Sequence, residues 1–376
     1  MKVFNHKFSF KNNVQLIKND AEFIKTTIDI IKSAKETIYL QTYIFEVDEI
    51  TEPLVNALNE KAQEGLEISI VLDSFGSIDF PISKLHYGIH FRFFSPLLSK
   101  GLLSIGRRLH SKVLIIDFKR AVVGGINYSK RFNSPSSTKP WLDYACLITG
   151  EEVFNLARSL KLNPIVIYKE KENCMVKTNI NDWSRFKNQI YRSYTRAIKV
   201  SKKDITIVAP YFLPGKKFLK VLKKAVERGV EVRLIFSANS DHPLERWCSK
   251  YLYSWLLESG VSIYEWDESI VHGKIAIIDS KWVTIGSYNH NFTSHFGNHE
   301  MNLEIQDSKF ASIVQTEVNC ILKNSNKITE SSWDKKNIMI HKILETSTYI
   351  FANILTIISL LLISRRKEKS DINLLE

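Results

Sequence analysis

The sequence repeats itself once, and this repeat limits the folds that the chain can adopt. Residues 109–127 read LHSKVLIIDFKRAVVGGIN, and residues 271–289 read VHGKIAIIDSKWVTIGSYN. Five identical pairs share one separation along the chain: His110 with His272, Lys112 with Lys274, Asp117 with Asp279, Gly124 with Gly286, and Asn127 with Asn289. Identity at a fixed offset indicates a duplicated structural unit.

The repeat extends upstream of both motifs. Residues 36–45 match residues 203–213, and residues 54–72 match residues 218–236 as an amphipathic helix, a glycine and a strand. Each half therefore predicts a strand, a helix, a strand and then a hairpin that carries the motif. Because alternating strands and helices favour parallel pairing in layered sheets, we predict an α/β protein. Its two tandem lobes should be related by a pseudo-twofold axis, with an active site between them.

Composition suggests where the lobes begin and end. We place the first lobe at residues 1–168 and the second at residues 183–340. Residues 169–182 are polar and suit a linker. An apolar C-terminal segment with a basic end is expected at residues 341–376.

The spacing within each motif suits one face of a strand. His110 and Lys112 are two residues apart, as are His272 and Lys274, so each pair shares a face. The aspartates stand beside turn residues, and we expect Asp117 and its repeat partner to fix the hairpin. The returning strands should bring both asparagines, Asn127 and Asn289, back to the histidine edge, where the preceding glycines allow close approach.

Two histidines, two lysines and two asparagines suit phosphodiester chemistry without a metal or another cofactor. One histidine attacks phosphorus and the other protonates the leaving alcohol, while the lysines and asparagines stabilise charge on the phosphoryl oxygens. Each histidine also needs a carboxylate on its other nitrogen to fix the tautomer. Asp143 and Glu300, which follow the motifs, are the candidates, and Glu304 competes with Glu300.

These segments resemble the paired HKD motifs of the phospholipase D superfamily, over about residues 15–310. Short segments near the motifs resemble those of bacterial cardiolipin synthases in particular, among them GLEISIVLDSFGS, PYFLP, SDHPLERW and NHEMNLEI. The resemblance implies metal-independent transfer through a covalent phosphatidyl-histidine, with the full motifs, aspartates included, as catalytic residues. It also implies that His110 is the nucleophile and His272 the acid and base, although the repeat itself does not distinguish them.

The positive charge has two interpretations, ordinary solubility and an anionic partner. The formal net charge is +12, which suits a phospholipid membrane or, as the less favoured alternative, nucleic acid. Residues 346–364 contain no charged residue and just reach the length of a spanning helix. Three interpretations stay open for them: a transmembrane anchor, an in-plane or re-entrant helix, and a helix packed on the protein.

The N-terminal sequence and the cysteines bear on localisation. Lysines and an aspartate interrupt every apolar run in the first 35 residues, so we expect no signal peptide. Four scattered cysteines are typical of a reduced compartment. We predict a membrane-associated protein with a cytoplasmic catalytic part, and we make no prediction of its oligomeric state.

An apolar stretch at residues 91–108 precedes the first motif and ends in Arg107 and Arg108. One interpretation is a lip that admits acyl chains, with these arginines binding substrate phosphates. The other is an ordinary core loop. A cluster of His290, His295 and His299 lacks regular metal-ligand spacing, so we expect a structural or surface role for it.

Three functions compete. The first is a phosphatidyltransferase that makes cardiolipin from phosphatidylglycerol. The second is a phospholipase D hydrolase or a nuclease of the same superfamily. The third is a non-catalytic membrane scaffold, which the intact motifs in both halves disfavour.

Overall fold

The computed structural model of the chain describes residues 7–19, 21–95, 107–133, 139–165, 170–182 and 187–336. The first half contains β1 (Asn12–Lys18), α1 (Ala21–Lys32), β2 (Thr37–Thr42), α2 (Glu52–Gln63), β3 (Glu67–Asp73), the 3-10 helix η1 (Ile82–Lys84), β4 (Ile89–Phe94), β5 (Lys112–Ile116), β6 (Arg120–Gly124), α3 (Lys130–Asn133), β7 (Tyr144–Gly150) and α4 (Glu151–Ser159). The second contains β8 (Met175–Asp182), β9 (Lys187–Asn188), α5 (Gln189–Val200), β10 (Asp204–Val208), α6 (Lys216–Glu227), β11 (Glu231–Ser237), α7 (Pro243–Tyr251), α8 (Tyr253–Glu258), β12 (Ser262–Trp266), β13 (Ile275–Ile278), β14 (Trp282–Gly286), α9 (Phe292–Phe296), β15 (Glu300–Gln306), α10 (Ser308–Lys323), β16 (Asn326–Ile328) and α11 (Glu330–Lys336).

Each half forms one mixed sheet, and the two sheets have the same topology. The first has the strand order β1-β7-β6-β5-β2-β3-β4, and the second has β16-β12-β11-β10-β13-β14-β15-β8-β9. Read in reverse, the second sheet repeats the first and adds β9 and β16 at its edges. The strands β2, β3 and β4 pair in parallel, as do β10, β11 and β12, whereas the motif hairpins pair antiparallel. The predicted two tandem α/β lobes are confirmed.

The motif strands are buried on both faces because each separates two hydrophobic cores. In β5, Val113 and Ile115 join the core between the two sheets, while Leu114 and Ile116 join the core beneath α1 and α2. Strand β13 divides in the same way between the central core and the core of the second half. Double burial explains why both strands read as continuous apolar runs rather than as alternating ones.

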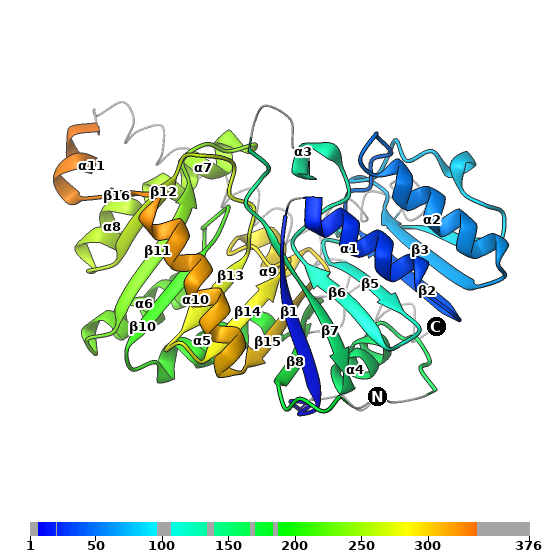
Figure 1. Ribbon diagram of the computed structural model, residues 1–376. Helices are drawn as coiled ribbons and strands as arrows, with labels where there is room; N and C mark the ends of the chain where they lie inside the picture. The colour runs from blue at the N-terminus through cyan, green and yellow to red at the C-terminus, as the bar shows by residue number, and fades with distance from the viewer. Residues whose placement is uncertain are drawn as a thin grey trace, which may run out of the picture.

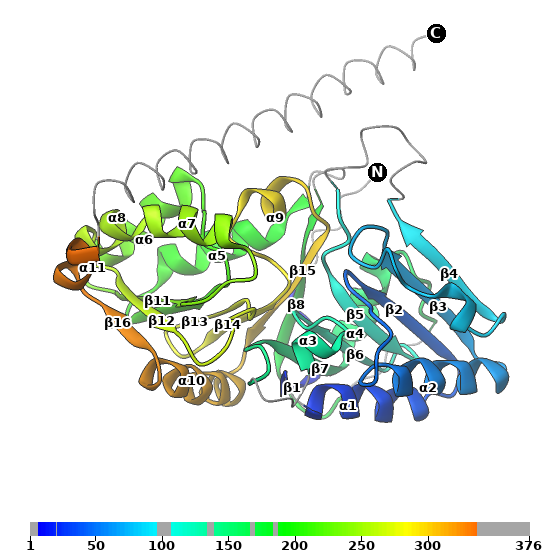
Figure 2. The same cartoon turned by 90° about the horizontal axis from the view of Figure 1, so that it is seen from above.

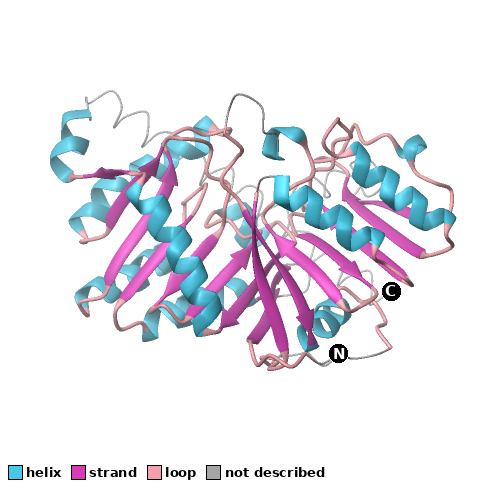
Figure 3. Cartoon of the chain, in the orientation of Figure 1, coloured by secondary structure: helices cyan, strands magenta, loops and turns pink. Residues whose placement is uncertain are grey.

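Helices cover the outer face of each sheet, and the inner faces meet. Figures 1 and 3 show the two sheets side by side in the middle of the molecule, with α10 lying in front of the second one. Seen from above, α1 and α2 lie on one side of the molecule and α5 and α6 on the opposite side (Figure 2). The central core draws on both sheets and on residues of α4 and α10, so the halves share one interior.

The linker prediction is wrong for residues 175–182. They form β8, which pairs with β15 over seven residues and therefore belongs to the second sheet. Its asparagines are buried and hydrogen-bonded inside the protein: Asn179 donates to Glu304 at 2.7 Å, and Oδ1 of Asn181 accepts from the backbone of Ile190 at 3.0 Å, whereas Nδ2 of Asn181 has no partner among the described residues. These buried polar side chains gave the strand the composition of a linker.

Among the described residues, no helix combines the length and apolarity that crossing a bilayer requires. The apolar stretch at residues 346–364 lies outside the described residues, as does most of the stretch at residues 91–108.

A glycine fixes the junction between β7 and α4. Gly150 has φ +104°, and a Cβ atom on it would lie 2.1 Å from the carbonyl oxygen of Lys11, beside the paired strand β1. We predict that Gly150→Ala lowers the free energy of unfolding by roughly 2–4 kcal/mol, because it adds a backbone clash to an unfavourable φ. Gly65→Ala is the matched control: its φ is +87° with no atom within 4 Å, so only the conformational cost of about 1–2 kcal/mol remains. Urea denaturation of both variants measures the difference, and equal losses would contradict this account.

Candidate active site

The two motif histidines each bind a carboxylate from the opposite half of the chain. Nδ1 of His110 lies 2.9 Å from Oε2 of Glu300, and Nδ1 of His272 lies 2.5 Å from Oδ2 of Asp143. Both carboxylates are the ones that the sequence suggested. The crossing between halves was not predicted. It means that neither half alone contains a histidine together with its carboxylate partner.

Glu304, the rival to Glu300, has other partners. Its carboxylate accepts from Nε1 of Trp282 at 2.8 Å and from Nδ2 of Asn179 at 2.7 Å. It therefore supports β8 and β14 and is not bound to His110.

The backbone holds both histidines by the same cross-half contact. The N–H groups of His110 and of the next residue donate to the carbonyl of His299, at 3.1 and 3.0 Å. The N–H groups of His272 and of the next residue donate to the carbonyl of Leu142, both at 2.8 Å. His299 and Leu142 are the residues immediately before the two carboxylates. One short crossing segment from each half thus fixes both the backbone and the side chain of the other half's histidine.

The lysines of the two motifs meet at the same centre. Nζ of Lys112 donates to the carbonyl of His110 at 2.6 Å, and Lys274 makes the equivalent bond to His272. Burial, followed by the charge of Lys274, lowers the pKa of Lys112 to about 7. Burial lowers the pKa of Lys274 to about 8, although Asp143 and Glu300 oppose the shift. The lysines repel each other, so the site binds an anion favourably.

Both histidines rest as neutral imidazoles. Burial, with Lys274, lowers the pKa of His272 to about 4, and burial lowers that of His110 against the opposing effect of Glu300. Burial alone would raise the pKa of the Asp143 carboxyl, but His272 and Lys274 hold it below its ordinary value. Since each Nδ1–H donates to an ionised carboxylate, Nε2 carries the lone pair that a ligand can meet.

The asparagines end the returning strands at the histidine side. The hairpin pairs Lys112 with Gly124, and continuing this register places Asn127 beside the residues just before Lys112. Oδ1 of Asn127 accepts from the backbone of Ile44 at 3.2 Å. Oδ1 of Asn289 is buried without a hydrogen-bond partner among the described residues, an unsatisfied acceptor that is costly to bury.

The motif aspartates lie at the other end of their hairpins. The carboxylate of Asp117 accepts the backbone N–H groups of residues 35–37 at 2.8–3.2 Å, and that of Asp279 accepts those of residues 202–204 at 2.7–3.2 Å. Both residues have positive φ, 52° and 53°. Each lies seven positions along the chain from its histidine, with the extended strand β5 or β13 between them, so about 20 Å separates the two side chains. We therefore assign them to the turn and to the start of β2 and β10, rather than to the reacting centre.

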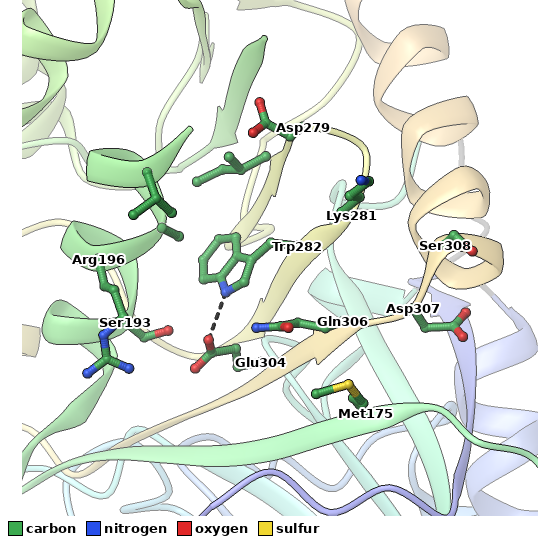
Figure 4. A pocket seen from close by; sticks show the side chains of 13 residues that line it. Met175, Ser193, Arg196, Asp279, Lys281, Trp282, Glu304, Gln306, Asp307 and Ser308 are labelled. Atoms are coloured by element: carbon green, nitrogen blue, oxygen red, sulfur yellow. Dashed lines mark hydrogen bonds between the residues drawn. The ribbon is translucent and has the colours of Figure 1, made fainter. Parts of the chain in front are cut away.

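A cavity of about 450 Å³ lies beside Asp279, between α5, the β13–β14 turn, β15 and the start of α10. Figure 4 shows Trp282 in its wall, hydrogen-bonded to Glu304, with Asp279 at its upper edge. Neither motif histidine lines it, so this cavity is separate from the candidate site.

The two arginines before the first motif have different surroundings. Nη2 of Arg107 binds both oxygens of Asp182 at 3.1 Å, which ties it to the end of β8 in the other half. The Arg108 guanidinium lies 4.7 Å from the ring centroid of Phe75. That either arginine binds substrate phosphate stays a prediction.

A network of hydrogen-bonded polar side chains next to His110 was not predicted from the sequence. Tyr39 donates to Gln41 at 2.8 Å, Gln41 donates to Ser111 at 2.6 Å, and the Ser111 hydroxyl lies 2.9 Å from Nδ1 of His299. His299, for which we predicted a structural or surface role, is buried and contacts Ser111, the residue after His110. The repeat replaces three members with Val208, Gly273 and Leu142, so the network exists in one half only. Comparing the repeats residue by residue would have revealed this asymmetry.

Aromatic rings flank both imidazoles and were also missed. The ring centroid of Tyr43 lies 5.3 Å from that of His110. Those of Phe132 and Trp141 lie 5.3 and 5.8 Å from that of His272. Within the described residues, no group of three histidine, cysteine or acidic side chains has the geometry of a metal site.

Comparison with known proteins identifies the family. The sequence profile described as "Cardiolipin synthase, PLD-like domain" matches residues 27–137 and 194–322, both halves of the repeat. Cardiolipin synthase B of Salmonella typhimurium is 30% identical over 354 residues, covering 85% of this chain and 83% of that protein. Cardiolipin synthase 1 of Staphylococcus aureus is 29% identical over 331 residues, covering 81% and 66%. The chain therefore belongs to the cardiolipin synthase family of the phospholipase D superfamily, a family of phospholipid phosphatidyltransferases.

A solved structure shares the fold. The phosphatidylserine synthase of Haemophilus influenzae superposes with a TM-score of 0.73 at 15% sequence identity, covering 95% of this chain and 97% of that one. The two-lobed architecture thus extends over nearly the whole length of both proteins.

The position of Asp279 predicts a variant that separates stability from activity. Asp279→Asn should lower the free energy of unfolding by about 1–3 kcal/mol, because an amide nitrogen would face a backbone donor. Asparagine tolerates positive φ, so the turn itself is preserved. Phospholipid turnover at a temperature where the variant is folded should match wild type. Asp143→Asn is the contrasting variant and should lose turnover by about 10²–10⁴-fold. A similar loss of turnover in Asp279→Asn would contradict the assignment to the turn.

The lysine pKa values predict a pH profile. Lysine is charged below its pKa, so Lys112 and Lys274 lose their charge as the pH rises through about 7 and about 8. We expect kcat/KM, which reports ionisations of the free enzyme, to fall between pH 7 and 9 by about tenfold per pH unit for each lysine that must be charged. Circular dichroism over the same range controls for unfolding. A profile that is flat to pH 10 would show that these charges do not bind the phosphate.

Proposed function

We propose that this chain makes cardiolipin by transferring a phosphatidyl group from one phosphatidylglycerol to a hydroxyl of another, through a covalent phosphatidyl-histidine. The observation that carries the proposal is the pair of crossed histidine–carboxylate contacts, at 2.9 and 2.5 Å, with a buried lysine beside each histidine. The names of the relatives support cardiolipin as the product.

The first half-reaction uses the two histidines in different protonation states. Nε2 of one attacks phosphorus, and the bond from phosphorus to the glycerol oxygen breaks. The other histidine gives its proton to that oxygen, so that free glycerol leaves. Its proton is gained when the substrate binds, because the anionic phosphate favours the imidazolium form.

The second half-reaction reverses these roles. The histidine that gave its proton now takes one from the acceptor hydroxyl, whose oxygen attacks phosphorus and releases the first histidine. Asp143 and Glu300 keep the Nδ1 protons in place throughout and stabilise the imidazolium that forms. With the repeat equivalent in both halves, the assignment of His110 as nucleophile rests on the family resemblance.

Charge on the phosphoryl oxygens is met by the lysines and asparagines. Lys112 and Lys274 lie at the centre of the site, and an oxyanion would relieve their mutual repulsion. The amide of Asn289, whose Oδ1 has no partner among the described residues, can turn to donate through its NH₂ group. In this proposal the motif residues supply the charge stabilisation, and a metal has no assigned step.

The substrate places the protein at a membrane. A formal net charge of +12 attracts it to anionic phospholipids, and the lipid acceptor is concentrated in the bilayer. We therefore propose a membrane-associated protein whose catalytic part faces the cytoplasm.

Product analysis tests the proposal. Purified full-length protein incubated with labelled phosphatidylglycerol should yield cardiolipin and free glycerol. His110→Ala and His272→Ala should each remove nearly all turnover, and the double variant should be no worse than either single one, because both residues act in one cycle. Phosphatidic acid in large excess over cardiolipin would make the protein a hydrolase. Cleavage of DNA or RNA without lipid turnover would make it a nuclease.

A further inference from the structure

Exposed hydrophobic side chains concentrate in two segments. Of the eleven large hydrophobic side chains that are strongly exposed in the described part of the chain, six lie in residues 75–82 and 244–251. They are Phe75, Ile78 and Ile82 in the first segment and Leu244, Trp247 and Tyr251 in the second, with exposed fractions from 38% to 61%. We call these two segments the rim. Clustering of this kind on a soluble surface indicates an interaction site.

The two rim segments have equivalent positions in the repeat. Residues 75–82 follow β3, and residues 244–251, which form most of α7, follow β11. These strands are the middle members of the two parallel triplets. Figure 1 shows α7 at the upper side of the molecule, beyond the ends of β11 and β12, and Figure 2 looks onto this side. Each motif histidine precedes a strand, β5 or β13, that runs antiparallel to its neighbour β2 or β10, so both rim segments lie at the sheet ends where the histidines are found.

Each rim segment borders one motif. The Arg108 guanidinium, two residues from His110, lies over the ring of Phe75. Asp73, at the base of the same loop, accepts the backbone N–H of Leu109 at 2.7 Å. On the other side, Nδ2 of Asn291, two residues after the motif residue Asn289, donates to the carboxylate of Glu245 in α7 at 3.4 Å. Each rim segment thus contacts residues next to one of the two motifs.

The chemistry of the rim fits a lipid interface. Tryptophan, tyrosine and phenylalanine with aliphatic neighbours are the side chains that settle at headgroup depth. Lys216 and Lys217 at the start of α6 are exposed and form no ion pair among the described residues. The backbone N–H of Phe212, just before α6, donates to Ser249 of α7 at 3.2 Å, so these lysines lie near the rim. Their charge suits anionic headgroups.

The chain also leaves the described part close to the rim. Nε1 of Trp333 in α11 donates to Ser254 of α8 at 3.1 Å, and α8 follows α7 directly. The sequence then continues to the uncharged stretch at residues 346–364.

We infer that the rim docks on an anionic phospholipid bilayer and seats the entrance of the active site against the headgroups. The inference rests on the proposed function, because a phosphatidyl donor keeps its acyl chains in the bilayer while its phosphate meets the histidines. Drawing those chains fully into water would be unfavourable. Contact from both halves at once holds the entrance over the membrane surface.

Vesicle binding by full-length protein tests the inference. Ile78→Asp and Trp247→Asp, one in each segment, should each weaken partitioning onto phosphatidylglycerol vesicles at least ~10-fold, since each removes an apolar contact and adds a repelled charge. Ile313→Asp is the matched control: Ile313 is 53% exposed on α10, outside the rim, and its partitioning should stay within about twofold of wild type. All three variants should turn over dispersed short-chain phosphatidylglycerol at the wild-type rate.

The two readouts separate the possible failures. If wild type turns over short-chain lipid but the rim variants still bind vesicles like Ile313→Asp, the docking inference is wrong. If the rim substitutions instead convert a dimer to a monomer in light scattering and leave vesicle binding unchanged, the rim joins two copies of the chain, which also overturns it. Absence of lipid turnover in wild type, with normal vesicle binding, would count against the proposed function alone.

Discussion

The crossed contact between each histidine and the carboxylate of the other half is the constraint on which the rest of the site depends. It demands that the two sheets pack against each other with their motif hairpins in matched positions. The central core, which takes residues from both sheets and from α4 and α10, supplies that rigidity. A loose hinge between two independent lobes would vary the distance from His110 to Glu300 and remove the preorganisation that acid–base work requires. The shared core therefore holds in place a site whose parts come from both halves.

Much of this arrangement could be predicted from the sequence because the motif and its flanking elements occur twice. A fixed offset between motifs predicts two copies of one topology, and the apolar runs of β5 and β13 predict buried strands. Asp143 and Glu300 could be selected because each stands where a strand-like run begins after its motif. Their crossing could not be predicted, since local sequence carries no information on which of two equivalent histidines lies nearer in space. The same limit applies to β8: its pairing strand β15 and the partner of its buried Asn179, Glu304, lie more than a hundred residues away along the chain.

The motif aspartates belong to the repeated sequence pattern but do not lie at the reacting centre. Asp117 and Asp279 belong to the spacing that marks the family resemblance, yet about 20 Å of strand separates each from its histidine. Their carboxylates collect backbone N–H groups at the start of β2 and β10 while their own backbones occupy the left-handed region. Because these strands lie beside the motif strands, a fault in the turn would displace the strand that carries the histidine. Their influence on catalysis is thus indirect and passes through the hairpin.

The two halves have nevertheless diverged around the carboxylates. Gly125 stands beside Asp143, and a Cβ atom there would lie 2.4 Å from its Oδ1. The corresponding residue in the second half is Ser287, whose hydroxyl donates to Glu300. Glu300 also accepts from Ser294 at 2.6 Å and from Asn298 at 3.1 Å, so its charge is shared among several donors.

Asp143 has a simpler set of partners. Apart from His272, it accepts from the backbone N–H of Tyr144 at 2.8 Å. A carboxylate that accepts fewer bonds keeps more of its charge for the imidazole, so the imidazoles of His110 and His272 are supported unequally. Because each carboxylate shell is built by the half opposite its histidine, a change in one half alters the histidine of the other. In the mechanism proposed above, this unequal support is what would let a duplicated, nearly symmetric scaffold use one histidine as the nucleophile and the other as the acid.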